Sequence, residues 1–366
     1  MKIAILGTRG IPNNYGGFEQ FAEYLALGLV KKGHDVTVYN SHSHPYQNDV
    51  WRDVKIRHIY DPEKTIGTAG QFVYDFLSIL DTRTKKFDVI LELGYTSSSV
   101  FFCFHPKKSV VITNMDGLEW KRAKYSHRVQ KYLLWAEALA AKKSDFLVSD
   151  SMGIQDYIKE KYGLDSRYIP YGAHLFDGEN DGVLVEYGLQ PYKYNMLIAR
   201  LEPENSIEII LDGVVKGKSE VPFLVIGNNE TKFGMYLKEK YTNVKEVVFV
   251  GGIYEIETLN NLRFFSNLYF HGHTVGGTNP SLLEAMASSS LICAHANTFN
   301  STILEDDAFF FSSVDDVATV LKNVNKIEHD AKLVANRAKI MELYSWDKIT
   351  AAYEKLFMDA LDCPAV

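Results

Sequence analysis

Cysteine is scarce in this chain, with only three residues among 366, at Cys103, Cys293 and Cys363. Three scattered cysteines are too few for a disulfide framework or a zinc site. No apolar run approaches the roughly 20 residues that a membrane-spanning helix needs. The first residues enter a predicted strand without the pattern of a signal peptide. Together these absences predict a cytosolic protein.

Positive charge is also in short supply, since 39 Lys and Arg face 46 Asp and Glu and give a net charge of −7. This balance argues against a general nucleic-acid-binding protein. A hydrophobic content of 46% and a charged content of 23% are ordinary for a soluble globular protein. The aromatic content of 13% fits sugar-stacking surfaces, lipid-facing surfaces or simply core packing. The length predicts two domains, each able to bury a core.

The order of apolar runs predicts alternating strands and helices. Residues 2–6 read as a buried strand, residues 20–32 show helical apolar spacing, and residues 36–39 form the next strand. Further predicted strands at 87–91, 110–116 and 146–149 are followed by a second series between 194 and 311. Such a βαβ succession indicates parallel, doubly wound sheets and therefore an α/β fold.

A dinucleotide-binding domain is the first alternative for such a fold, and two features disfavour it. The turn after the first strand, from Gly7 to Gly10, lacks the G-x-G-x-x-G spacing. The second strand ends at Asn40, where a dinucleotide-binding domain places an acid for the ribose. A dehydrogenase is therefore disfavoured.

The most informative stretch, residues 269–286, reads as a strand, a glycine-containing turn and the start of a helix. Thr278 or Asn279 can cap that helix, and Pro280 suits its first position. We expect the capped end to present free N–H groups and the positive end of the helix dipole to a phosphate. Glu284, one turn further, can accept hydrogen bonds from ribose hydroxyls. The alternative is a capped helix that only closes a βα unit.

The string Gly-Gly-Thr-Asn-Pro-Ser-Leu-Leu-Glu-Ala-Met at 276–286 resembles the donor-binding motif of retaining GT-B glycosyltransferases of the glycogen-synthase-like superfamily, glycosyltransferase family 4. More narrowly, this string and Asp-Gly-Leu-Glu-Trp-Lys-Arg at 116–122 resemble the bacterial rhamnosyltransferase branch. The resemblance implies two Rossmann-like domains that face an interdomain cleft. Residues 1–172, with a crossover helix at about 346–366, would bind the acceptor, and residues 173–345 would bind the nucleotide sugar.

The resemblance also implies a set of site residues. Asp116 and Arg200 would be catalytic, Asp116 by orienting or deprotonating the acceptor hydroxyl and Arg200 by stabilising the leaving diphosphate. The implied acceptor-binding residues are Asp116, Glu119, Trp120, Lys121 and Arg122. The implied donor-binding residues are Gly16, Gly17, Arg200, Asn205, Gly252, Ile253, His273, Gly277, Thr278, Asn279, Pro280, Ser281 and Glu284.

The chain departs from the superfamily at two of these places. Gly276 stands where many members carry a Glu eight residues before the one that matches Glu284, so a role for that first Glu is not carried over. Asn205 stands near where many members place a Lys, so the diphosphate would depend more on Arg200 and the helix end. Asp116 keeps a structural alternative, because Asp before a helix is a common N-cap.

A local excess of positive charge interrupts the otherwise acidic sequence. Residues 121–143 hold seven Lys and Arg against the single acid Glu137, an excess of six, and they include the aromatic residues Tyr132 and Trp135. One interpretation is a face toward an anionic membrane and a lipid-diphosphate acceptor. The other is a solvated helix face. The sequence does not separate the two.

The family resemblance implies metal-independent transfer with retained configuration and no cofactor beyond the donor. The expected donor is dTDP-L-rhamnose or otherwise a UDP-hexose, and the expected acceptor is a lipid-linked sugar or growing polysaccharide at the inner face of the plasma membrane. A GT-B nucleotide-sugar epimerase or a non-catalytic sugar-nucleotide-binding protein would share the architecture. An epimerase would consume donor without acceptor, and a binding protein would tolerate the loss of Asp116.

Overall fold

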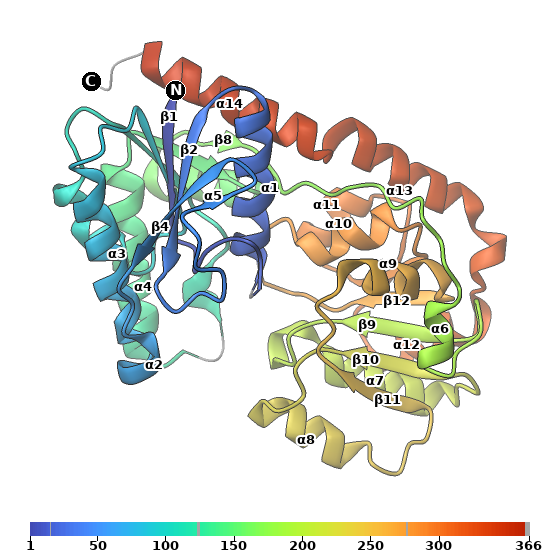
Figure 1. Cartoon of the computed structure of the whole chain (residues 1–366). Helices are drawn as coiled ribbons and strands as arrows, with labels where there is room; N and C mark the ends of the chain where they lie inside the picture. The colour runs from blue at the N-terminus through green and yellow to red at the C-terminus, as the bar shows by residue number, and fades with distance from the viewer. Residues whose placement is uncertain (15, 123–124, 276, 363–366) are drawn as a thin grey trace. The chain divides into compact units, whose positions relative to one another are not determined.

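The computed structural model describes residues 1–14, 16–122, 125–275 and 277–362. Its contacts divide the chain into two compact units. Unit 1 comprises Met1–Tyr171 and Trp346–Val366, and unit 2 comprises Gly172–Ser345. Each unit is built around one sheet (Figure 1), as the alternating apolar pattern predicted.

Unit 1 contains an eight-stranded sheet in the order β3-β4-β2-β1-β5-β6-β7-β8, parallel except for the pairing of β3 with β4. Its strands are β1 (Lys2–Leu6), β2 (Asp35–Ser41), β3 (Val50–Trp51), β4 (Val54–Ile59), β5 (Val89–Leu93), β6 (Val110–Asn114), β7 (Phe146–Ser149) and β8 (Arg167–Tyr168). Its helices are α1 (Gly17–Lys31), α2 (Glu63–Ile66), α3 (Ala69–Thr82), α4 (His127–Lys143), α5 (Met152–Tyr162) and α14 (Trp346–Asp362), with the 3-10 helices η1 (Ser99–Phe104) and η2 (Glu119–Lys121).

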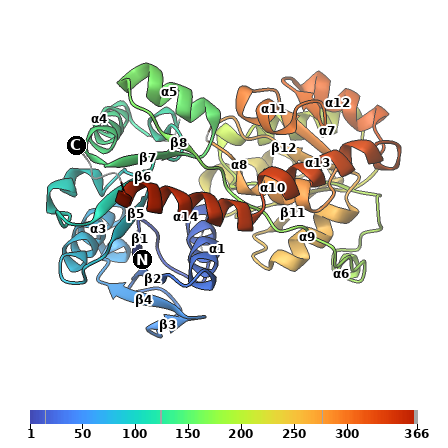
Figure 2. The same cartoon turned by 90° about the horizontal axis from the view of Figure 1, so that it is seen from above.

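Helices cover both faces of this sheet, with α1 on one face and α3 and α4 on the other (Figure 2). Helix α14 packs along α1 because both carry apolar side chains at helical spacing. The rings of Phe21 and Tyr353 meet at 5.4 Å. A Cβ on Gly28 would lie 2.4 Å from Thr350 Oγ1, so glycine is what permits this close approach.

Unit 2 contains a six-stranded, fully parallel sheet in the order β11-β10-β9-β12-β13-β14. Its strands are β9 (Asn195–Ile198), β10 (Phe223–Ile226), β11 (Val247–Gly251), β12 (Leu268–His271), β13 (Ile292–His295) and β14 (Phe309–Phe311). Its helices are α6 (Val183–Glu186), α7 (Ile207–Gly217), α8 (Lys232–Lys240), α9 (Ile256–Phe265), α10 (Pro280–Ala287), α11 (Thr298–Leu304), α12 (Val314–Asn323) and α13 (Asp330–Leu343), with the 3-10 helices η3 (Pro203–Asn205) and η4 (Lys326–Glu328).

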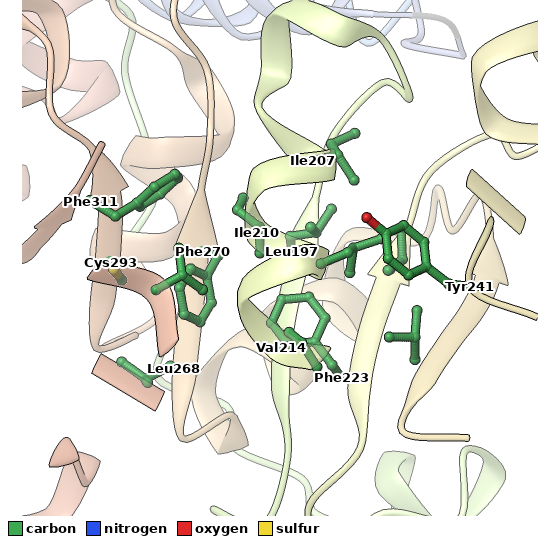
Figure 3. Close-up of a cluster of buried hydrophobic side chains, with 14 of the residues drawn as sticks. Leu197, Ile207, Ile210, Val214, Phe223, Tyr241, Leu268, Phe270, Cys293 and Phe311 are labelled. Carbon is green, nitrogen blue, oxygen red and sulfur yellow. The ribbon is translucent and has the colours of Figure 1, made fainter. Parts of the chain in front are cut away.

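The core of unit 2 lies between its sheet and helix α7 (Figure 3). Ile207, Ile210 and Val214 place one apolar stripe of α7 against Phe223 and Phe270, and all five are at most 1% exposed. Large aliphatic and aromatic side chains buried in this way supply most of the favourable free energy of folding. This packing holds the strand ends, and the loops that follow them, in fixed positions.

Candidate functional site

The strand order of unit 2 reverses between β9 and β12, because the chain runs from β9 outward to β11 and then returns to β12 (Figure 1). In doubly wound sheets, ligands bind beyond the carboxyl ends of the strands at such a reversal. The loops that leave these ends are residues 199–206 after β9 and residues 272–279 after β12. Most of the predicted donor-binding residues lie in these two loops and in the start of α10.

Hydrogen bonds join these loops to each other and to the loop after β13. The backbone N–H and the hydroxyl of Thr274 both donate to the carbonyl of Glu204, at 3.2 and 2.7 Å. The side-chain amides of Asn297 and Asn300 donate to the carbonyl of His273, at 3.0 and 3.2 Å. The loops at the carboxyl ends of these strands therefore form one surface connected by hydrogen bonds.

Two glycines allow the β9 loop to be approached from both neighbouring strands. A Cβ on Gly272, after β12, would lie 2.1 Å from the carbonyl oxygen of Asn205. A Cβ on Gly227, after β10, would lie 2.1 Å from the carbonyl oxygen of Ala199. Any larger residue at either position would push the loop away, so these glycines are required by sterics.

Helix α10 begins as predicted, and the structure decides which residue caps it. Asn279 is the N-cap, and its Oδ1 accepts from the N–H of Ser281 at 3.0 Å. Pro280 occupies the first helical position. Thr278 is 2% exposed and is not the cap. Gly276 lies outside the described residues, and its neighbour Gly277 is half-buried.

The expectation of free N–H groups in the first turn of α10 is wrong. The N–H of Ser281 is bound by the cap, and those of Leu282 and Leu283 donate to the carbonyl of Asn279, at 3.0 and 3.3 Å. Pro280 has no N–H. Any phosphate at this end must therefore take its hydrogen bonds from the turn before the helix, with the helix dipole as an added attraction.

Arg200 and Asn205, both predicted to bind the donor, occupy different environments. Arg200 follows β9 and its side chain is exposed. Asn205 is 5% exposed, and its side-chain amide donates to the carbonyl of Arg200 at 2.7 Å. The structure thus gives Asn205 a role in shaping the loop that presents Arg200.

Glu284 forms an ion pair that sequence reasoning missed. Its Oε2 accepts from Nη2 of Arg263 at 2.5 Å, and the arginine side chain is only 1% exposed. Arg263 also donates to Asn260 at 2.9 Å, and the hydroxyls of Ser281 and Tyr269 lie 2.6 Å apart beside it. No sequence signal marks Arg263, because an arginine in a short helix usually faces solvent.

His273 borders a small hollow on this surface with Thr274, Val275, Gly277, Asn279, Phe299 and Asn300. Its ring stacks on that of His271, with the ring centres 4.4 Å apart. His271 is 1% exposed, and burial holds its pKa well below the usual value, so this imidazole is neutral. The His273 ring therefore stacks on a neutral imidazole.

Gly252 and Ile253 follow β11, at the outer edge of the same sheet. Strands β10 and β9 stand between them and the β12 turn. The described residues of the chain contain no cluster of three or more His, Cys, Asp or Glu placed to hold a metal ion.

In unit 1, the strand order reverses between β1 and β5, and Gly16 and Gly17 begin α1 after the β1 loop. Glu19, in the first turn of α1, is 4% exposed and accepts from the hydroxyl of Thr8 at 3.2 Å and the N–H of Arg9 at 2.8 Å. A carboxylate here already balances part of the positive end of α1. Phosphate binding by Gly16 and Gly17 would have to occur beside that negative charge.

Asn40, near the end of β2, stands where a dinucleotide-binding domain has its ribose-binding acid, and here the residue has a structural role. The side chain is fully buried, and its amide accepts from the N–H of Ile11 at 3.1 Å and donates to the carbonyl of Ile11 at 2.8 Å. This pair of bonds fixes the loop after β1. An amide can both donate and accept, whereas an ionised carboxylate at this position could only accept.

Asp116 follows β6 with a φ of +49° and does not cap a helix. Its N–H donates to Oδ1 of Asn114 at 3.0 Å, whereas Ser126 is the N-cap of α4 and Leu118 precedes η2. The structural alternative for Asp116 is therefore wrong. The residue stands at the carboxyl end of a central strand, where ligands of doubly wound sheets bind.

The other predicted acceptor residues lie together in and around η2. Glu119 and Arg122 form an ion pair at 2.6 Å. Burial lowers the pKa of Arg122, but Glu119 and Asp116 outweigh it and the net shift is upward. Trp120 is half-buried and Lys121 is exposed, with its ammonium 5.4 Å from the centre of the Trp120 ring.

The basic segment 121–143 is mainly helix α4, and its charges divide between two faces. Glu137 faces inward and is 2% exposed. The exposed cations of the segment are Lys121, Arg128, Lys131, Lys142 and Lys143, and Lys124 lies outside the described residues. Trp135 stands among the exposed cations with 53% of its surface accessible. No helix within the described ranges is both long enough and apolar enough to cross a membrane.

Comparisons with known proteins fit this architecture. A family model described as "Domain of unknown function (DUF1972)" matches residues 1–174. Sucrose-phosphate synthase from Thermosynechococcus elongatus superimposes with a TM-score of 0.77 at 15% identity, covering 98% of each chain. HepE from Anabaena, in complex with UDP and glucose, gives 0.76 at 16% identity, covering 98% of this chain and 100% of its own. The chain has the GT-B fold.

A third GT-B structure is the α,α-trehalose-phosphate synthase (UDP-forming) from Burkholderia xenovorans, in complex with glucose-6-phosphate. Its TM-score is 0.72 at 12% identity, with 98% of this chain and 100% of that chain covered. No curated protein sequence matches the chain significantly. At these identities the likeness establishes the GT-B fold of both units, and chemistry has to be argued from the sites.

Proposed function

We propose that this GT-B protein is a glycosyltransferase whose donor substrate is a nucleoside-diphosphate sugar. The observation that carries the proposal is the connected loop surface at the β9–β12 reversal of unit 2. It combines an exposed guanidinium on Arg200, a capped and glycine-preceded helix end at Asn279, and the carboxylate of Glu284. Guanidinium and a helix N-terminus attract diphosphate, and a carboxylate accepts from ribose hydroxyls.

The proposed donor is dTDP-L-rhamnose, on the resemblance of residues 276–286 and 116–122 to rhamnosyltransferases. A UDP-hexose is the second candidate, since the Anabaena HepE structures contain UDP and UDP-glucose. In either case Arg200 and the helix end would stabilise charge on the leaving diphosphate as the glycosidic bond breaks. We propose that transfer retains the anomeric configuration and requires no metal ion or cofactor.

Unit 1 would supply the acceptor site, with Asp116 as the group that orients or deprotonates the acceptor hydroxyl. Glu119, Trp120, Lys121 and Arg122 would contact the acceptor, which we propose to be a lipid-linked sugar or growing polysaccharide. The outward cations of α4 and the exposed Trp135 support a peripheral contact with an anionic membrane, at its cytoplasmic face.

The test of transfer is release of free nucleotide from dTDP-rhamnose, UDP-glucose and related donors, with and without a lipid-linked sugar acceptor and in the presence of EDTA. Release that depends on acceptor and is abolished in Asp116→Asn supports the proposal. Conversion of the donor without acceptor and without net release of free nucleotide would instead indicate an epimerase. Normal turnover in Asp116→Asn would remove that residue from the chemistry.

The membrane contact is tested by sedimentation with vesicles of phosphatidylcholine alone or with phosphatidylglycerol. We expect binding only to the anionic vesicles, weakened by salt and by the joint change Lys131→Ala with Trp135→Ala. Equal binding by this variant would show that the basic segment is simply a solvated helix face.

A further inference from the structure

Glu137, the only acid in the basic segment, is the centre of a buried polar cluster in unit 1. Its Oε1 accepts from the hydroxyls of Tyr157 at 2.8 Å and Tyr162 at 2.6 Å, and from the ammonium of Lys161 at 2.8 Å. The hydroxyl of Tyr95 lies 3.4 Å from Oε2. A carboxylate that is 2% exposed requires such donors, because an uncompensated buried charge is strongly unfavourable. We call these five residues the Glu137 cluster.

The predicted acceptor-binding residues lie between the end of β6 and the start of α4, at 115–126, and we call this stretch the acceptor segment. The Glu137 cluster contacts the acceptor segment through Trp120. The ammonium of Lys161 lies 5.6 Å from the centre of the Trp120 ring, within cation–π range. The indole Nε1 of Trp120 is buried and has no hydrogen-bond partner among the described residues. Trp120 thus lies against the Lys161 ammonium, which donates to both Glu137 and the Tyr157 hydroxyl.

The acceptor segment has little regular structure of its own. Among the described residues between the end of β6 and the start of α4, the only regular element is the three-residue η2. Asp116 has a positive φ, and Leu118 makes no side-chain cap for η2. The position of such a short segment depends on side-chain packing. Trp120 and Tyr125 are its large aromatic side chains, and Trp120 is in contact with the Glu137 cluster.

We propose that Glu137 is a positioning residue, which through Tyr157 and Lys161 holds Trp120 and so places Asp116 and its neighbours for the acceptor. The catalytic part of this inference rests on the proposed transferase function, whereas the placement of Trp120 does not. Glutamine at position 137 would offer one acceptor oxygen and would turn an NH2 group toward hydroxyl and ammonium donors. The support beneath Trp120 would then rearrange.

The experiment uses the full chain labelled with 5-fluorotryptophan, which gives one fluorine NMR signal for each of the four tryptophans. Trp120→Phe assigns the signal of interest. In Glu137→Gln we expect that signal alone to shift or broaden, with those of Trp51, Trp135 and Trp346 unchanged. We also expect kcat to fall on the order of 10- to 100-fold with the donor KM unchanged, as for a small misplacement of reacting groups.

Glu160→Gln is the matched control, because Glu160 lies exposed on the same helix as Tyr157 and the change has the same chemistry. It should leave all four signals and kcat unaltered. If Glu137→Gln does not fold, Tyr157→Phe removes a single donor and should still move the Trp120 signal.

An unchanged Trp120 signal in a folded variant would overturn the proposal, as would equal movement of all four signals, which would indicate general loosening. If the wild-type protein transfers no sugar, the proposed function fails. The Trp120 signal then still decides whether Glu137 positions the segment.

Discussion

The ion pair between Arg263 and Glu284 makes both residues important for the stability of unit 2, although the sequence does not indicate that they form a pair. Arg263 is 1% exposed, so its charge depends on the Glu284 carboxylate for compensation. Removing one partner of a buried pair leaves an isolated charge, and such changes typically destabilise a protein by about 3–5 kcal/mol. Because the Glu284 side chain is 17% exposed, we expect the lower end of that range.

We therefore predict that Glu284→Ala lowers the free energy of unfolding by roughly 3 kcal/mol. The double change Arg263→Met with Glu284→Met should recover most of this loss, because no charge is then buried. Urea unfolding at pH 7 measures both. A stability of Glu284→Ala within about 0.5 kcal/mol of the wild type, the usual scatter of surface changes, would contradict the role assigned to the pair.

At the residue scale, Asn279 and Arg263 differ in how far the sequence predicts their contacts. A helix cap is a local signal, so the short list of Thr278 or Asn279 contained the residue that the structure selects. The Arg263–Glu284 pair joins two helices across 21 positions, and Glu137 reads as one acid among cations. Contacts of this kind depend on tertiary packing, which residue spacing does not encode.

At the level of elements, the loops after β9 and β12 are predicted to function as one unit. Gly272→Ala would place a Cβ 2.1 Å from the Asn205 carbonyl and force the two loops apart. We expect a loss of about 1–3 kcal/mol in stability, the usual range for overpacking, together with weaker nucleotide binding. Gly178→Ala is the control, since its nearest neighbour would lie 4.0 Å away. Unchanged nucleotide affinity in a folded Gly272→Ala protein would show that the loop contact does not shape the site.

The 3-10 helix η4 carries a lysine whose titration should be visible in stability. Lys326 is 4% exposed, and burial lowers its pKa from 10.5 to about 7. Between these values the unfolded chain binds the proton and the folded chain does not, so this residue makes stability rise with pH. Below pH 7 both states are protonated and the contribution is constant.

Lys326→Met should remove that rise. Its stability difference from the wild type should change with pH by a slope that approaches roughly 1.4 kcal/mol per pH unit above pH 8. Chemical denaturation at pH 7, 8 and 9 measures the slope, which is independent of the constant loss of the Lys326 hydrogen bond to the Phe264 carbonyl. The exposed Lys322→Met is the control. Parallel stability profiles for wild type and Lys326→Met would contradict the lowered pKa.

Element types followed from the sequence wherever apolar runs were long and uniform. Strand β7 has the predicted limits of 146–149, and α1 begins three residues before the predicted helix. Strand β4 was not predicted, although Lys55 and Arg57 alternate with Val54 and Ile56 as in a strand that has one exposed face. In the fold, Lys55 pairs with Asp35 and Arg57 with Asp81, both at 2.8 Å, so these charges are accommodated without breaking the strand.

At the level of the whole molecule, the predicted α/β class and the two parallel sheets are confirmed, and both units belong to a GT-B fold. These features follow from the βα rhythm, which repeats over the entire chain. The donor sugar, the acceptor and the catalytic roles stay predictions. A shared fold hosts many substrates, and the side chains of a few loops decide among them.

Calorimetry tests most directly whether the loops after β9 and β12 in unit 2 bind a nucleoside diphosphate. Binding of dTDP, UDP, GDP and their sugar conjugates would be measured without added metal. Arg200→Ala is the decisive variant, because its side chain is exposed and its loss should not disturb folding. Lys193→Ala removes an exposed cation before the amino end of the same strand and is the matched control.

We predict binding of dTDP and dTDP-rhamnose that is lost in Arg200→Ala and kept in Lys193→Ala. Preference for UDP would keep the site and change the donor. Failure of every nucleotide to bind the folded wild-type protein, or equal binding by both variants, would contradict the assignment of these loops as the donor site.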